Sequence, residues 1–220
     1  MRSRLDAPGS AHWAADPVLH RSTAIARTRG ASRHTGVMHP AFLYVPGARL
    51  SQAELSAARI DGHVFEIGEA YAPADLVETA DLRAASVAVF VHPGTAASGP
   101  TAAWIHGAGD AAPSVHHVKR AVDRRLRPRT SARLVFHDTV LPAPDMQLIG
   151  GIAVSTPART MLDLATALHR DPRMQAWMER LALLRPGLPA ETAPVLRSLR
   201  RVPGSRVGLA ALERLDLRTR

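Results

Sequence analysis

The sequence predicts an α+β fold, in which a small module of one helix and one hairpin precedes a mixed α/β domain with a small sheet and a helical C-terminus. Three observations predict it. A capped helix is followed by two short strands between residues 51 and 73. Short β-branched or alternating runs recur between residues 115 and 155, and helix-forming segments interrupted by prolines fill residues 172–220.

The first 37 residues differ from the rest of the chain. Residues 1–37 have no apolar periodicity and are rich in Arg, Ser, Ala and His, so we expect them to form a disordered tail. The same pattern fits translation that starts at Met38, and the sequence leaves both interpretations open. We expect folding to begin near Met38, with residues 38–95 as the first module and residues 96–220 as the second domain.

The first module has the pattern of a helix and a hairpin. Residues 51–60 are predicted to form a helix, because Ser51 and Glu54 have the spacing of a capping box. Two short strands are predicted at residues 63–67 and 70–73. A helix, a strand, a turn and a strand in this order form the last part of a winged helix, so we expect a winged-helix-like module.

A longer helix is predicted to follow the hairpin. From Asp75 to Val91, apolar residues recur every three to four positions, and Asp75 is a suitable N-cap. A Pro-Gly pair ends this pattern. Residues 98–107 are then predicted to form a short helix, with Pro100 near its first turn.

The rest of the chain is predicted to hold a small sheet followed by helices. Strands are expected at residues 115–122 and 133–140, and two more within residues 146–155, joined by a pair of glycines. A helix starts near Pro157, and the residues after 172 are predicted to be helical. The first of these helices should bury one apolar stripe, formed by Met161, Leu164, Ala165 and Leu168. The later helical region should be broken at Pro186, Pro194 and Pro203-Gly204.

Composition excludes several classes of protein. The chain has no cysteine, which excludes disulfides and thiolate metal sites. No stretch approaches the roughly 18 apolar residues of a membrane span, and no apolar segment follows the N-terminal arginines as in a secretory signal. We therefore expect a cytoplasmic protein that does not contact a membrane.

The charge is distributed unevenly. The net charge of +9 indicates a nucleic acid or an acidic partner. Residues 47–95 hold three arginines against seven acids, whereas residues 96–220 hold nineteen Lys/Arg against ten acids. The basic character of the folded part is therefore in its C-terminal half.

Three segments resemble motifs of one protein family. They are residues 61–73 (DGHVFEIGEAYAP), 98–107 (SGPTAAWIHG) and 151–164 (GIAVSTPARTMLDL). In this order and spacing they resemble the AbiEi-family antitoxins of type IV toxin–antitoxin systems, or unpaired relatives with the same two parts. The resemblance covers roughly residues 46–168.

The resemblance implies a function for each part. The winged helix would bind promoter DNA and repress transcription of its own operon, and the C-terminal domain would counteract a toxin that in this family is a nucleotidyltransferase. Such a protein is a regulator and not an enzyme. The alternative is a stand-alone regulatory or protein-interaction protein without a cognate toxin, and the neighbouring gene would separate the two.

Candidate DNA-binding residues lie in two places. A winged helix places its second helix in the major groove, and arginines hold phosphates. However, Glu54, Glu66 and Glu69 oppose phosphate binding, so a degenerate structural module stays an alternative. The basic run after residue 118 could contact phosphates, could contact an acidic surface of a toxin, or could simply be a solvated strand and loop. The candidates are Gln52, Ser56, Arg59, Lys119, Arg120, Arg124, Arg125, Arg127, Arg129 and Arg133.

The sequence predicts no catalytic residue, metal site or cofactor. A nuclease motif could start at Asp145, but no lysine follows Lys119, so the usual Asp/Glu-x-Lys cannot form. His106 is expected to cap its helix or pack in the core. The neighbours His116 and His117 should face opposite sides of a strand, which makes a shared metal ion unfavourable. Arg159 and Asp163 are expected to form a structural pair one helical turn apart.

Overall fold

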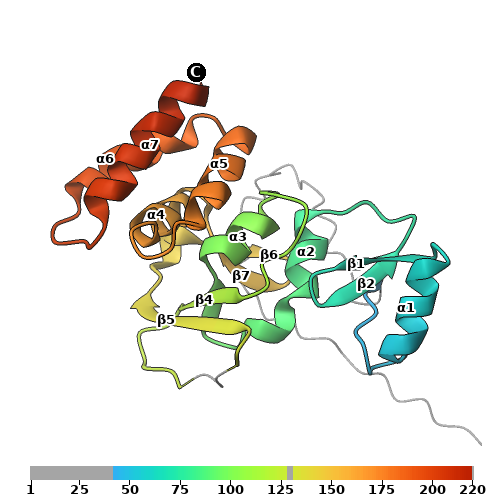
Figure 1. Ribbon diagram of the computed structural model, residues 1–220. Coiled ribbons are helices and arrows are strands. Elements are labelled where there is room, and N and C mark those ends of the chain that lie inside the picture. The colour runs from blue at the N-terminus through green and yellow to red at the C-terminus, as the bar shows by residue number, and fades with distance from the viewer. Residues whose placement is uncertain (1–41, 128–130, 220) are drawn as a thin grey trace, which may run out of the picture. The chain divides into compact units, whose positions relative to one another are not determined.

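The computed structural model describes residues 42–127 and 131–219 (Figure 1). The expected disordered tail at residues 1–37, the expected start at Met38 and the beginning of the first module lie outside the described residues. Within the described ranges the fold mixes helices with two small sheets, so the α+β class is confirmed.

The first described elements are a helix and a hairpin. Helix α1 (Gln52–Ile60) begins with the predicted capping box, in which the backbone N–H of Ser51 donates to the carboxylate of Glu54 at 2.7 Å. Strands β1 (Val64–Ile67) and β2 (Ala70–Pro73) pair antiparallel. Tyr44 exchanges two backbone hydrogen bonds with Tyr71, so a third extended segment lies beside the hairpin.

The predicted helix from Asp75 to Val91 is wrong in length. Helix α2 (Ala80–Ser86) starts after Thr79, whose hydroxyl accepts the N–H of Leu82, and a 3₁₀ turn, η2 (Ala88–Phe90), follows it. The Ser86 hydroxyl donates to the Arg83 carbonyl at 2.7 Å, and three valines follow at every second position. Both features weaken a helix, because β-branched side chains and hydroxyls that compete for carbonyls favour other conformations.

A five-stranded sheet forms the centre of the larger part. Its order is β5-β4-β3-β7-β6, with β3–β7 and β4–β5 parallel and the other two pairs antiparallel. The central strand β3 was not predicted, because it is a short run of small residues with no alternation. The strands are β3 (Thr95–Ala97), β4 (His116–Arg120), β5 (Leu134–Val140), β6 (Met146–Ile149) and β7 (Ile152–Ser155), with a 3₁₀ turn, η3 (Ala143–Asp145), before β6.

Helices gather on one side of this sheet. The short helix α3 (Gly99–Ile105) follows β3 directly, and α4 (Pro157–Ala167) packs against α3 and against the three last helices. In Figure 1 α6 and α7 run side by side next to α4. The predicted stripe of α4 is buried, which confirms that prediction. The four helices are α4 (Pro157–Ala167), α5 (Met174–Leu184), α6 (Leu188–Ser198) and α7 (Ser205–Thr219).

The predicted breaks are confirmed at two places and wrong at the third. Pro186 lies between α5 and α6, and Pro203-Gly204 precedes α7. Pro194 lies inside α6 instead. Proline removes one helical hydrogen bond, but Pro194 and Ala190 are both exposed, so water can satisfy the Ala190 carbonyl.

Helix α7 crosses α4 at very short range. A Cβ on Gly208 would lie 2.5 Å from the Ala165 carbonyl oxygen, so only glycine permits this approach. Ala211, Leu212 and Leu215 of α7 are buried in the same apolar cluster as the α4 stripe. A second cluster, around Trp104 and Ile105, lies between the sheet, α2 and the hairpin. Within the described ranges, no helix is both long enough and apolar enough to cross a membrane.

Candidate nucleic-acid interface and ionic pocket

The candidate residues of α1 differ in how they are held. The Gln52 side-chain amide donates to the Tyr71 hydroxyl at 2.8 Å and to the Ser56 hydroxyl at 3.3 Å, so it is fixed against the hairpin. Arg59 is exposed at the last turn of α1. Neither residue is buried.

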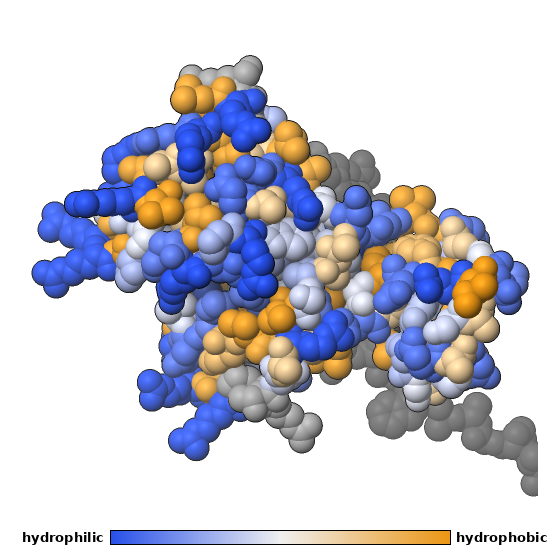
Figure 2. Space-filling model, in the orientation of Figure 1, coloured by the Kyte–Doolittle hydropathy of each residue, from blue (hydrophilic) through white to orange (hydrophobic). Residues whose placement is uncertain are grey.

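The middle of the basic run is the part that reaches solvent. Arg124, Arg125 and Arg127 are exposed, and the Arg125 side chain is 87% exposed although its Nε lies 3.5 Å from Asp138. Long hydrophilic side chains project from the surface near β5 and around α6 and α7 (Figure 2). The candidate Arg129 lies outside the described residues.

Arg120 is occupied within the protein. Its guanidinium donates to the carbonyls of Val122, Asp123 and Asp138, and it lies 3.0 Å from the Asp138 carboxylate. Its side chain is only 15% exposed. These contacts fix the turn after β4, so Arg120 is not a free cation.

Arg133 joins the hairpin to the larger part of the fold. It forms a bidentate ion pair with Glu69, in which Nη1 donates to Oε2 at 2.6 Å and Nη2 donates to Oε1. The same carboxylate accepts from the buried ring of His116 at 3.3 Å, and Phe90 stacks on that ring at 4.5 Å. Burial lowers the pKa of His116, and Glu69 partly offsets this effect. We call Glu69, Phe90, His116 and Arg133 the Glu69 cluster.

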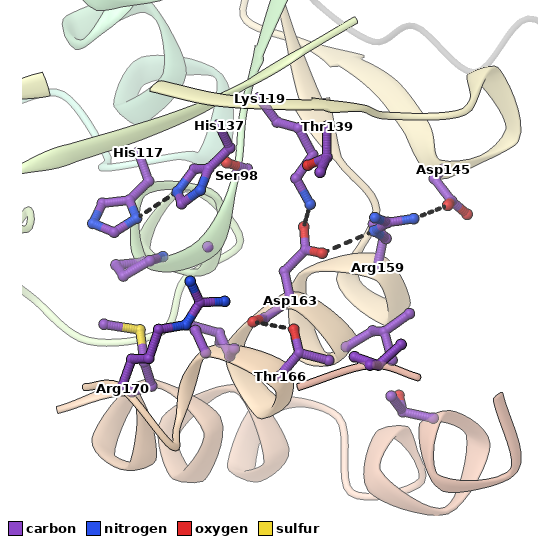
Figure 3. A pocket seen from close by; sticks show the side chains of 18 of the residues that line it. Ser98, His117, Lys119, His137, Thr139, Asp145, Arg159, Asp163, Thr166 and Arg170 are labelled. Atoms are coloured by element: carbon purple, nitrogen blue, oxygen red, sulfur yellow. Dashed lines mark hydrogen bonds and ion pairs between the residues drawn. The ribbon is translucent and has the colours of Figure 1, made fainter. Parts of the chain in front are cut away.

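Lys119 is buried in a second ionic group. Its Nζ lies 2.6 Å from Oδ2 of Asp163, whose Oδ1 accepts from Arg159 Nε at 3.0 Å. Arg159 also donates to Asp145 at 2.8 Å, which completes an ionic chain of four residues (Figure 3). Burial lowers the pKa of Lys119, against the raising effect of Asp163. The predicted pair of Arg159 and Asp163 is confirmed.

Two histidines lie beside this chain. His117 Nδ1 and His137 Nε2 are 3.2 Å apart, and both rings belong to the sheet face that carries Lys119. Burial, reinforced by His137, lowers the pKa of His117 to about 4, and burial with the charge of Lys119 lowers the pKa of His137. Both rings are neutral at pH 7. His116 and His117 face opposite sides of β4, as expected.

A pocket of about 980 Å³ opens beside the histidine pair. Its polar side is formed by the ionic chain, the two histidines, Thr139 and Arg170, and its other side by apolar residues of α4, α5 and α6 and of the segment after α6. Within the described part of the chain, no three His, Asp or Glu side chains are grouped so as to hold a metal ion. The apolar residues are Leu162, Met174, Val195, Leu199 and Val202.

Comparison with known families assigns the larger part. Residues 95–194 match the family model of the AbiEi antitoxin C-terminal domain. This chain carries an AbiEi antitoxin domain. The family resemblance is thus confirmed over this segment, and it supports an antitoxin role in a toxin–antitoxin system. No curated protein matches the chain.

The AbiEi domain match runs from the central strand β3 into α6. It contains the whole ionic chain and both histidines of the pocket. The apolar wall is partly formed by residues after the matched segment, namely Val195, Leu199 and Val202. The outer side of the pocket is therefore built by a part of this chain that the family model does not cover.

The sequence alone does not predict this pocket. It places Lys119 in a basic surface run, and it suggests for His117 only a metal site shared with His116, which alternation along a strand makes unfavourable. The usable signal was alternation, because His117 and Lys119 are two positions apart and so share a face of the strand. His137 could not be added from the sequence, since its place opposite Lys119 depends on the parallel register of β4 and β5.

Proposed function

We propose that this protein is the DNA-binding antitoxin of a type IV toxin–antitoxin system and represses transcription of its own operon. The match of residues 95–194 to the AbiEi antitoxin C-terminal domain carries this proposal. In it, residues 38–95 form the DNA-binding module and residues 96–220 counteract a cytoplasmic nucleotidyltransferase toxin. The protein acts by binding and not by catalysis.

The geometry of the first module supports a winged-helix role. A capped helix, α1, precedes an antiparallel hairpin, and Tyr44 adds a further extended segment beside β2. In the proposal α1 is the recognition helix and the hairpin is the wing. Gln52, Ser56 and Arg59 of α1 supply the contacts to base edges, since base contacts specify the sequence that is bound.

The acidic residues of this module oppose DNA less than their number suggests. Glu54 accepts hydrogen bonds from Ser51 in the capping box, which hold its carboxylate in place but leave it charged. Glu69 is paired with Arg133. Of the three glutamates that argued against DNA binding, Glu66 alone is exposed on a strand, and no ion pair engages it within residues 42–127 and 131–219. Glu54 and Glu66 therefore keep charges that oppose phosphate, and salt screens such exposed charges beyond about a Debye length.

The phosphate contacts are assigned to the exposed middle of the basic run. Arg124, Arg125 and Arg127 are accessible, and Arg120 fixes the two residues that precede them, Val122 and Asp123. Lys119, Arg120 and Arg133 stay within the proposal only as residues that support this surface, because internal carboxylates and carbonyls occupy them. Arg129 is kept as a further candidate from the sequence.

Binding of the protein to its own upstream DNA tests this assignment. Replacing Arg124, Arg125 and Arg127 by alanine should weaken binding to all sequences and reduce the slope of log K against log salt by about 0.9 for each lost phosphate contact. Replacing Gln52 and Arg59 by alanine should reduce discrimination against unrelated DNA. Changing Arg185, Arg200 and Arg214 to alanine removes the same charge elsewhere and should have a smaller effect. If the first variant binds like the parent, the arginine run does not contact DNA.

The antitoxin role has a separate test. Co-expression with the product of an adjacent nucleotidyltransferase gene should restore growth that the toxin alone arrests. Absence of such a gene favours the second candidate, a stand-alone regulatory or protein-interaction protein of the same fold. The DNA measurement does not distinguish these two, whereas the growth measurement does.

A further inference from the structure

The unpaired charges of the pocket beside the histidine pair lie on different elements of its wall. Within the ionic chain, Lys119 and Arg159 balance Asp145 and Asp163. Two other carboxylates of the pocket wall are also paired, Asp138 with Arg120 and Asp171 with Arg173. Glu191, in the first turn of α6, is turned towards Gly187 at the N-terminal end of that helix, where the helix dipole stabilises a negative charge.

Arg170 is the cation that remains. It follows α4, and its side chain extends into the pocket below His117 and His137 (Figure 3). No ion pair engages Arg170 among the residues that the structure describes. An unpaired positive charge therefore lies beside the histidine pair, while the remaining carboxylate of the lining, Glu191, lies in the first turn of α6.

The histidine pair adds hydrogen-bonding capacity at the same place. Both rings are neutral, so one of the two nitrogens at the 3.2 Å contact donates and the other accepts. The two nitrogens outside this contact are His117 Nε2 and His137 Nδ1. In either arrangement one of them carries a hydrogen and can donate, and the other can accept. A cation is disfavoured here, because Lys119 lies directly opposite His137 in the sheet register and Arg170 lies on the other side.

The apolar wall sets a second requirement on a ligand. Leu162 and Met174 form its floor, and Val195 and Leu199, which are 48% and 42% exposed, form its rim. A volume of about 980 Å³ accommodates a ligand of the size of a metabolite. A bare inorganic ion would leave this wall uncovered.

We propose that the pocket binds a small organic anion, a carboxylate or a phosphate monoester with an apolar group. Arg170 forms the ion pair with the anionic group, the His117–His137 pair donates a hydrogen bond to it, and the apolar group covers Leu162, Val195 and Leu199. The site is independent of DNA binding, since neither α1 nor the exposed arginines line it.

Titration of the full-length protein with hexanoate, phenyl phosphate and the neutral hexanamide tests this site. Nuclear magnetic resonance of ¹⁵N-labelled histidines should show saturable shifts at His117 and His137 with at least one anion, and none with hexanamide. Hexanoate alone would assign the site to carboxylates, phenyl phosphate alone to phosphate monoesters. Equal binding of hexanamide, or no shift with either anion, would overturn the proposal.

Matched variants identify the residues. Arg170→Gln should weaken anion binding about tenfold or more, because it removes a charge-assisted hydrogen bond. Arg214→Gln, the same change at an exposed site on α7, should leave it unaltered. Leu199→Trp fills the rim at an exposed position and should abolish binding while the melting temperature stays near that of the parent. Unchanged affinity in Arg170→Gln would show that Arg170 does not hold the anion.

Discussion

The carboxylate of Glu69 binds the guanidinium of Arg133 across 64 residues of sequence. Glu69 is in the turn of the β1–β2 hairpin, and Arg133 directly precedes β5 at the edge of the large sheet. The pair thus fixes the hairpin against the AbiEi domain. It also neutralises an acid and a base whose charges, taken from the sequence alone, have opposite effects on DNA binding.

Glu69→Gln should therefore destabilise the protein by about 1 kcal/mol, since a half-exposed ion pair contributes modestly and the buried His116 loses a charged partner. The free energy of unfolding in urea measures this. Glu66→Gln, an exposed acid on the neighbouring strand, is the matched control and should be near neutral. Equal effects of the two changes would mean that the Glu69 cluster contributes no stability.

Asp163→Asn should cost about 3–5 kcal/mol, because it leaves the buried Lys119 without a counter-charge. Lys119→Met should cost less, since Asp163 retains Arg159. The double variant should be more stable than the sum of the two single effects predicts. These values come from urea unfolding, and a greater loss for Lys119→Met than for Asp163→Asn would contradict the assignment of Asp163 as the shared carboxylate.

Stability should fall as the pH decreases from about 6.5 to about 4. Burial lowers the pKa of His117 to about 4, whereas its ordinary value is 6.5. In this window the unfolded chain takes up a proton that the folded protein does not, so His117 contributes a loss of roughly 3 kcal/mol that is complete below pH 4. His117→Gln should flatten the dependence of the melting temperature on pH. The exposed His63→Gln should retain the parental slope, and an unchanged slope in His117→Gln would refute this cause.

The protein should leave plasmid DNA, RNA and nucleotides intact in Mg²⁺ or Mn²⁺. Arg159 binds both Asp145 and Asp163, and Lys119 binds the second of them, so cations of the protein already occupy these carboxylates. Gel electrophoresis and nucleotide chromatography measure the outcome. Cleavage that disappears in Asp145→Ala would show a nuclease instead.

Local signals predicted much of the fold. The capping box of α1, the hairpin strands, the two strands joined by glycines and the stripe of α4 all depend on residues a few positions apart. The central strand β3 was missed because its neighbours on both sides supply its stability. The length of α2 was also mispredicted, because its start is decided by the hydroxyl of Thr79 and not by apolar spacing.

The site was less predictable than the fold, because it is built from long-range pairings. The sequence singled out Arg124, Arg125 and Arg127 as basic, and they are exposed. It could not show that Lys119 pairs with Asp163 of α4, which lies 44 positions away in the sequence. Nor could it show that Arg133 binds Glu69 of the hairpin, which lies 64 positions away.

The close crossing of α7 over α4 extends the folding unit past the family match. Gly208 lies against Ala165, and Leu212 and Leu215 cover the apolar stripe that the match contains. A polypeptide cut after residue 194 would expose that stripe to water and would be prone to aggregate. Expression of the antitoxin domain by itself should therefore retain α7, and a larger side chain at position 208 should mimic the effect of the truncation.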